Sequence, residues 1–249
     1  FTEEDFDFFP GNTNLTQFNT GIVGDMGTGK TQLTKALIYN LTKDAKQNRG
    51  VTPNILIFDY KKDYIKEDFV KATGARVIKP LNMPLNLFDL RGIETKREAK
   101  QKINSFIDIL EKIYPNIGPV QRENLKEAVK ACFEIDGNGL GTVGPTLKDI
   151  FVSYKENNSP DSPYSIMSDL VDGEYFSENK SDILPFSEVT KGVVVVNLFE
   201  AGSDDNAKNV LVTIFLNLFY EHMLKIEKQP FIGCDPQLRF IHSMLLVDE

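Results

Sequence analysis

The 249-residue sequence contains no tryptophan, only two cysteines and only two histidines. Cys132 and Cys234 lie far apart, and neither belongs to a Cys-x-x-Cys or Cys/His cluster. Such clusters supply the ligands of structural zinc, so the sequence argues against a zinc site. Two isolated cysteines fit a reducing compartment, and we expect a cytoplasmic protein.

Long apolar runs are also missing. The longest ones are too short and too interrupted to span a bilayer, so no membrane segment is expected. The first ten residues are acidic and aromatic, without the basic start and apolar core of a signal peptide. Because the sequence lacks an initiator methionine and stops abruptly at Glu249, we expect it to be part of a longer protein.

Charge of one sign prevails. The chain has 36 Asp+Glu against 28 Lys+Arg, a formal net charge of −8. An acidic chain is not an obvious nucleic-acid binder, because affinity for the phosphate backbone comes from Lys and Arg. Residues 41–102, however, hold 14 Lys+Arg against 8 Asp+Glu. This basic segment is either an ordinary solvated surface or a side that faces a polyanion, and both interpretations stay open.

One segment matches the phosphate-binding pattern Gly-x-x-x-x-Gly-Lys-Ser/Thr at every fixed position: Gly24-Asp25-Met26-Gly27-Thr28-Gly29-Lys30-Thr31. Glycines allow the backbone to curl tightly and turn its N–H groups inward around an anion. The apolar residues 19–23 predict a strand before this loop, and helical spacing of apolar residues predicts a helix after it. Strand, loop and helix in this order are the context that a phosphate-binding loop requires.

The loop predicts a site for ATP and Mg²⁺. Lys30 is expected to reach the β- and γ-phosphates and to act in catalysis, while the Thr31 hydroxyl is expected to ligate the metal. The predicted nucleotide-binding residues are Gly24, Asp25, Met26, Gly27, Thr28, Gly29, Lys30, Thr31 and Gln32.

An apolar run from Met244 to Val247 ends in two carboxylates, Asp248 and Glu249. Beside a phosphate-binding loop, Asp248 is expected to hold Mg²⁺ and Glu249 to polarise the attacking water. Alone, the pair is an ordinary acidic strand end. Asp248 lies 218 residues after Lys30, so intervening chain must fill the gap between the two motifs.

Further apolar runs at residues 55–58 and 193–199 predict buried parallel strands. The first ends in Asp59, which faces either the nucleotide or a neighbouring subunit, or is a surface loop acid. Residues 80–90 read as an ordered loop. We expect an α/β fold with a RecA-like P-loop NTPase core, a mainly parallel sheet and a helical insertion. Its predicted parts are residues 1–90, the insertion 91–188 and residues 189–249, where the core stops short of its C-terminal end.

These motifs occur in the order found in the HerA/FtsK superfamily, which the chain resembles over most of its length. The second strand of that superfamily ends in an Asp-x-x-Gly-Glu-Tyr-like pattern, to which Asp59-Tyr60-Lys61-Lys62-Asp63-Tyr64 is similar. Lys62 and Asp63 replace the common Gly and Glu, which leaves a family role for Asp63 without support. Residues 18–33 resemble most closely the ATPases of the phosphorothioation-dependent DNA restriction system.

The resemblance implies an ATP-hydrolysing DNA translocase or helicase-like motor in bacterial DNA restriction, that is, antiviral defence. Its implied partners are double-stranded DNA, partner restriction subunits and further copies of the chain in a hexameric ring. Two alternatives stay open. One is an ATP-dependent switch or assembly ATPase that does not translocate, and the other is a motor of the secretion or conjugation type.

Overall fold

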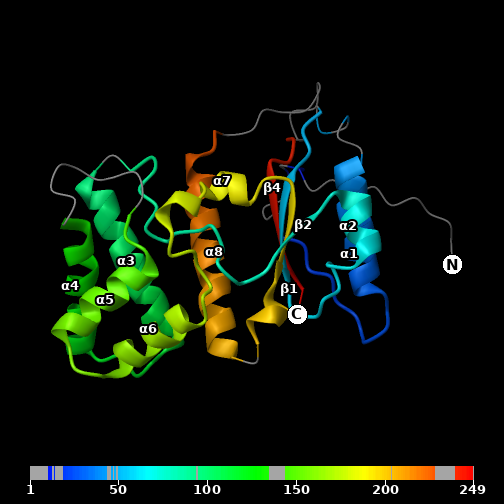
Figure 1. The fold of residues 1–249 in the computed structure, drawn as a ribbon. Coiled ribbons are helices and arrows are strands. Elements are labelled where there is room, and N and C mark those ends of the chain that lie inside the picture. The colour runs from blue at the N-terminus through cyan, green and yellow to red at the C-terminus, as the bar shows by residue number, and fades with distance from the viewer. Residues whose placement is uncertain are drawn as a thin grey trace. The chain divides into compact units, whose positions relative to one another are not determined.

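A computed structural model describes residues 11–12, 14, 19–43, 46, 48, 50–93, 95–134, 144–202, 204–227 and 239–248 (Figure 1). The chain divides into two compact units. The sheet unit comprises residues 1–77, 190–196 and 226–249, and the helical unit comprises residues 78–189 and 197–225.

Four strands form one all-parallel sheet, so the expected α/β class with its parallel sheet is confirmed. The strand order is β2-β3-β1-β4. The strands are β1 (Asn54–Asp59), β2 (Arg76–Ile78), β3 (Val193–Asn197) and β4 (Ser243–Asp248). Residues 55–58 of β1 and 193–196 of β3 are buried on both faces, as their continuous apolar sequences predict.

Strands β1 and β4 run side by side in a register that pairs Asn54 with Ser243 and Asp59 with Asp248. Parallel strands end at the same edge of a sheet, and ligands of open α/β sheets bind outside that edge. The pairing therefore sets two carboxylate-bearing residues next to each other where ligand binding is expected.

Two helices of the sheet unit, α1 (Lys30–Lys43) and α2 (Glu67–Thr73), lie next to each other on one side of the sheet (Figure 1). Between them and the sheet is one hydrophobic core, which includes Ile38, Ile57 and Phe69. The predicted helix after the loop is thus confirmed. The short helix α2 was not predicted.

The predicted strand at residues 19–23 is wrong. These residues form no strand in the structure, and the Val23 side chain is 96% exposed. A strand is stabilised by hydrogen bonds to a neighbour, and β4 pairs with β1 instead. Gly21 adds to the entropic cost of ordering so short a segment.

The helical unit consists of helices joined by ordered loops. They are α3 (Lys96–Ile113), α4 (Pro119–Glu134), α5 (Leu147–Asn157), α6 (Ser162–Asp172), the one-turn helix α7 (Phe186–Val189), α8 (Asp205–Lys225) and two 3₁₀ turns, η1 (Lys180–Asp182) and η2 (Leu198–Ala201). Thr146 with Asp149 three residues on predicts an N-cap for α5, and the structure confirms it: the Thr146 side chain accepts from the Asp149 N–H, and the Asp149 carboxylate accepts from the Thr146 N–H.

Two details of this unit differ from what the sequence predicts. The polar residues 157–163 predict a loop, but α6 already begins at Ser162 with Asp161 as its N-cap and Pro163 in its first turn. The apolar stripe of α8 is buried as far as Leu218, but Leu224 is 68% exposed. The glycines of residues 136–145 predict a turn, and this segment lies mostly outside the described residues. No helix in the described ranges combines the length and apolar character that crossing a bilayer requires.

Candidate nucleotide-binding site

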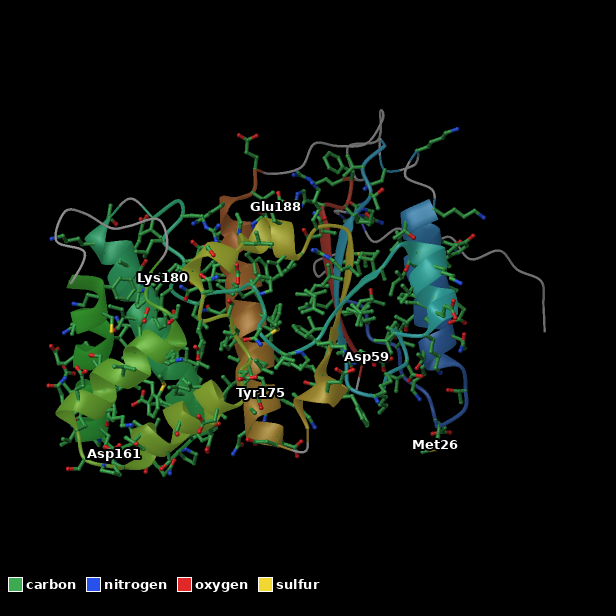
Figure 2. The ribbon with its side chains drawn as sticks, viewed as in Figure 1. Met26, Asp59, Asp161, Tyr175, Lys180 and Glu188 are labelled. Atoms are coloured by element: carbon green, nitrogen blue, oxygen red, sulfur yellow. The ribbon has the colours of Figure 1, made fainter. Side chains whose placement is uncertain are left out.

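The Gly24–Thr31 loop leads directly into α1 and is open to solvent. Figure 2 shows Met26 at its outer tip, where the side chain is 99% exposed. Gly27 and Gly29 adopt positive φ angles of 81° and 89°, which only glycine adopts without strain. A Cβ atom at Gly24 would lie 2.7 Å from the Thr28 hydroxyl oxygen. Glycine at positions 27 and 29 is therefore needed for this loop shape.

Lys30 bends back over the loop that precedes it. Its ammonium donates hydrogen bonds to the carbonyl oxygens of Gly24 and Asp25, the second at 2.8 Å. An ammonium group has three N–H donors, so one more is available to an oxygen of a bound phosphate. The first N–H groups of α1, which have no partner within a helix, face the same end. The loop thus gathers positive charge and hydrogen-bond donors.

The two predicted metal ligands, 217 residues apart, come together. The Thr31 hydroxyl lies 3.4 Å from Oδ2 of Asp248, at the end of β4. A hydroxyl and one carboxylate suit Mg²⁺, a hard cation that takes few protein oxygens and keeps water and phosphate oxygens as its other ligands. Among the described residues, no group of three or more His, Cys, Asp or Glu residues is arranged to hold a metal, so an all-protein cage is not present there. Glu249, the predicted general base, lies outside the described residues.

Asp59 ends β1 and turns its carboxylate into the protein (Figure 2). It is only 1% exposed, and three backbone N–H groups donate to it: those of Lys61 and Asp63 to Oδ1 at 3.1 Å, and that of Tyr64 to Oδ2 at 2.9 Å. Asp59 is therefore not a surface acid. Its two carboxylate oxygens accept these hydrogen bonds and thereby fix the conformation of the turn that follows β1.

The departures from the superfamily pattern fit this turn. Lys62 has φ of 63°, in the left-handed region that glycine favours, and it stands where the superfamily pattern has glycine. Asp63 pairs with Lys66 at 3.3 Å on the surface. Among the described residues, no contact gives Asp63 a part in the loop site.

Tyr64 is the site residue that sequence reasoning missed. It is fully buried, and its hydroxyl donates to Oδ2 of Asp248 at 2.7 Å. Burial, followed by the hydrogen bond to Asp248, raises the pKa of Tyr64, so the phenol stays protonated and remains a donor. The available sequence signal was its place at the end of the Asp59–Tyr64 pattern after β1, whereas its partner Asp248 follows only from the pairing of β1 with β4.

A phosphate-binding loop at the start of a helix, beside a parallel sheet whose strand end supplies an acid, defines the P-loop NTPase class of fold. The model of the family described as "Helicase HerA, central domain" matches residues 13–218. The chain belongs to this family. No protein among the curated sequences matches it.

Among solved structures, the chain is similar to VirB4 of Thermoanaerobacter pseudethanolicus, with a TM-score of 0.59 and 14% sequence identity. The similarity covers 90% of this chain but only 58% of the VirB4 chain. At this identity the likeness concerns the fold alone. It agrees with the expected P-loop NTPase core.

Proposed function

We propose that the chain is the ATP-binding and ATP-hydrolysing core of a motor of the HerA/FtsK kind. The observation that carries the proposal is the contact between Thr31 of the loop and Asp248 of β4. Two residues 217 positions apart meet at one end of the sheet, and Thr31 directly follows Lys30, whose ammonium donates to the loop carbonyls. A phosphate-binding loop that occurred by chance would not be expected to have an acidic strand end beside it.

In the proposed mechanism, the amides of the loop and the Lys30 ammonium bind the β- and γ-phosphates of ATP and stabilise the charge that develops on the transferred phosphoryl group. Thr31 and Asp248 would hold Mg²⁺, Asp248 through a water molecule. The metal neutralises phosphate charge when it is bound. Glu249 orients the attacking water and accepts its proton.

Double-stranded DNA is the proposed substrate of the motor. Part of the basic segment supports it, because Lys61 is exposed in the turn after β1; Lys66 is exposed as well but is paired with Asp63. Not all of the segment is available, since Arg91 is paired with Asp89 and Lys102 with Glu221. The basic surface proposed to face a polyanion is therefore smaller than the number of Lys and Arg residues in 41–102 suggests. It lies in the turn after β1, whose last residue, Asp59, pairs in register with Asp248 of the proposed nucleotide site.

The finer proposal is a cytoplasmic role in DNA restriction, as in DptH-type ATPases of the phosphorothioation-dependent system, with partner restriction subunits and a homo-hexameric ring. It is supported by the resemblance of residues 18–33. The second candidate is a motor of the secretion or conjugation type. The similarity in fold to VirB4 over 90% of the chain is the observation that supports this candidate.

The test is ATP hydrolysis by the full-length protein with and without duplex DNA, with Lys30→Ala as the blank. Stimulation by DNA that disappears in Lys30→Ala supports a DNA motor. Hydrolysis that is indifferent to DNA keeps the ATPase but favours an ATP-dependent switch. Absence of any difference between wild type and Lys30→Ala refutes the assignment of the site.

A further inference from the structure

The metal-facing carboxylate of the proposed site is held by a residue outside the predicted site. Both hydroxyl groups near Asp248, those of Tyr64 at 2.7 Å and Thr31 at 3.4 Å, approach the same oxygen, Oδ2. Within the described part of the chain, no hydrogen bond is directed at Oδ1. The two oxygens of this carboxylate are therefore not equivalent, and the Tyr64 hydroxyl, with the shorter contact, determines their orientation.

Tyr64 is itself fixed at both ends. Its backbone N–H donates to the buried Asp59 carboxylate at 2.9 Å. The Tyr64 and Phe69 rings meet edge to face, with centroids 5.4 Å apart and planes at 80°. Tyr64 also belongs to the hydrophobic core between the helices and the sheet. A side chain locked by packing and hydrogen bonds orients its partner at little further entropic cost.

We propose that Tyr64 is a positioning residue for the metal site: its hydroxyl holds Oδ2 of Asp248 and thereby presents Oδ1 to the hydrated metal of the nucleotide complex. This inference rests on the proposed function. Groups that orient a metal ligand without touching the metal commonly change metal affinity by about 10- to 100-fold when they are removed. A role confined to stability predicts no such change.

The helical unit offers a matched control. Tyr154 is also fully buried, and its hydroxyl donates to Oδ2 of Asp161 at 2.8 Å. Figure 2 labels Asp161 at the start of α6. Tyr154→Phe and Tyr64→Phe therefore each remove one hydroxyl from a buried Tyr–Asp hydrogen bond. Only Tyr64→Phe removes one that ends on a proposed metal residue.

The experiment measures binding of a fluorescent ATP analogue to the full-length protein, first in EDTA and then during titration with Mg²⁺. For Tyr64→Phe, we expect metal-free affinity within about twofold of wild type and a Mg²⁺ midpoint raised by about tenfold or more. Tyr154→Phe is expected to lower the thermal midpoint of unfolding and leave the Mg²⁺ midpoint unchanged. In an Asp248→Asn background, Tyr64→Phe is expected to add no further shift.

A folded Tyr64→Phe protein with the wild-type Mg²⁺ midpoint overturns the inference and leaves the proposed function intact. If Tyr64→Phe does not fold, Phe69→Leu replaces it, because it keeps the phenol but removes the ring edge that orients it. A smaller upward shift of the midpoint then supports the inference, and an unchanged midpoint overturns it. If the wild-type protein binds no nucleotide, both the proposed function and the inference are wrong.

Discussion

Asp59 gives the sharpest prediction about stability. Its buried carboxylate accepts three backbone hydrogen bonds, two at Oδ1 and one at Oδ2. Asp59→Ala leaves three N–H groups without their acceptor at a site that is 1% exposed. Hydrogen bonds to a charged group contribute about 1.5–3 kcal/mol each, and the losses overlap within one network. We therefore expect Asp59→Ala to lower the free energy of unfolding by about 3–5 kcal/mol.

Two further variants separate the carboxylate's role from a general effect of mutation. Asp59→Asn keeps one carbonyl oxygen that can accept the two hydrogen bonds now made to Oδ1, but its NH₂ group faces the Tyr64 N–H, which is also a donor. We therefore expect the free energy of unfolding to fall by about 1–3 kcal/mol. Asp63→Asn removes only the surface pair with Lys66, for which about 0.5 kcal/mol is expected. Urea unfolding followed by circular dichroism measures all three. Equal stability of Asp59→Ala and Asp63→Asn refutes the reasoning.

Three other outcomes are expected. Glu249→Gln should keep ATP binding and lose turnover, and normal turnover in single-turnover assays removes Glu249 from the role of general base. Glu221→Ala leaves the Lys102 side chain, which is 7% exposed, without its carboxylate partner, so urea unfolding should show that the free energy of unfolding falls by about 3 kcal/mol. Glu127→Ala breaks the more exposed pair with Lys130 and should lower it far less; equal losses contradict this. Burial, with nearby acids, raises the pKa of Tyr114 to about 12, above that of a free tyrosine. The stability that this protonated phenol contributes is therefore present below about pH 10 and lost as pH rises toward about 12. Tyr114→Phe should lose less stability than wild type over this range in thermal unfolding, and parallel losses contradict the assignment.

Much of the fold was predictable because its signals are local and strong. The apolar runs of β1 and β3 indicate strands buried on both faces, and the structure confirms them. The Thr146 cap follows from a spacing of three residues between Thr and Asp. The helix that follows the phosphate-binding loop was predicted from its apolar spacing. In each case the sequence pattern that indicates the element lies within a few residues, even where the contacts that stabilise it are distant.

Features that depend on distant contacts were not predictable. Helix α2 has seven residues and a single buried one, Phe69, whose ring packs on Tyr64 rather than within the helix. The hydrogen bond from Tyr64 to Asp248 joins residues 184 positions apart, and only the register of β1 and β4 brings them together. Strand formation at residues 19–23 failed as a prediction for the same reason, since apolar character does not specify a partner. The predicted boundaries at residues 90 and 188 stay predictions.

The most direct test of the central claim is equilibrium binding of ATP to the full-length protein in Mg²⁺, with wild type compared to Lys30→Ala. The account predicts saturable binding by wild type and its loss, or near loss, in a Lys30→Ala protein that remains folded. Removal of the ammonium held at the Gly24 and Asp25 carbonyls takes away the loop's side-chain cation. Equal affinity of the two proteins for ATP contradicts the assignment of Gly24–Thr31 as the phosphate-binding loop.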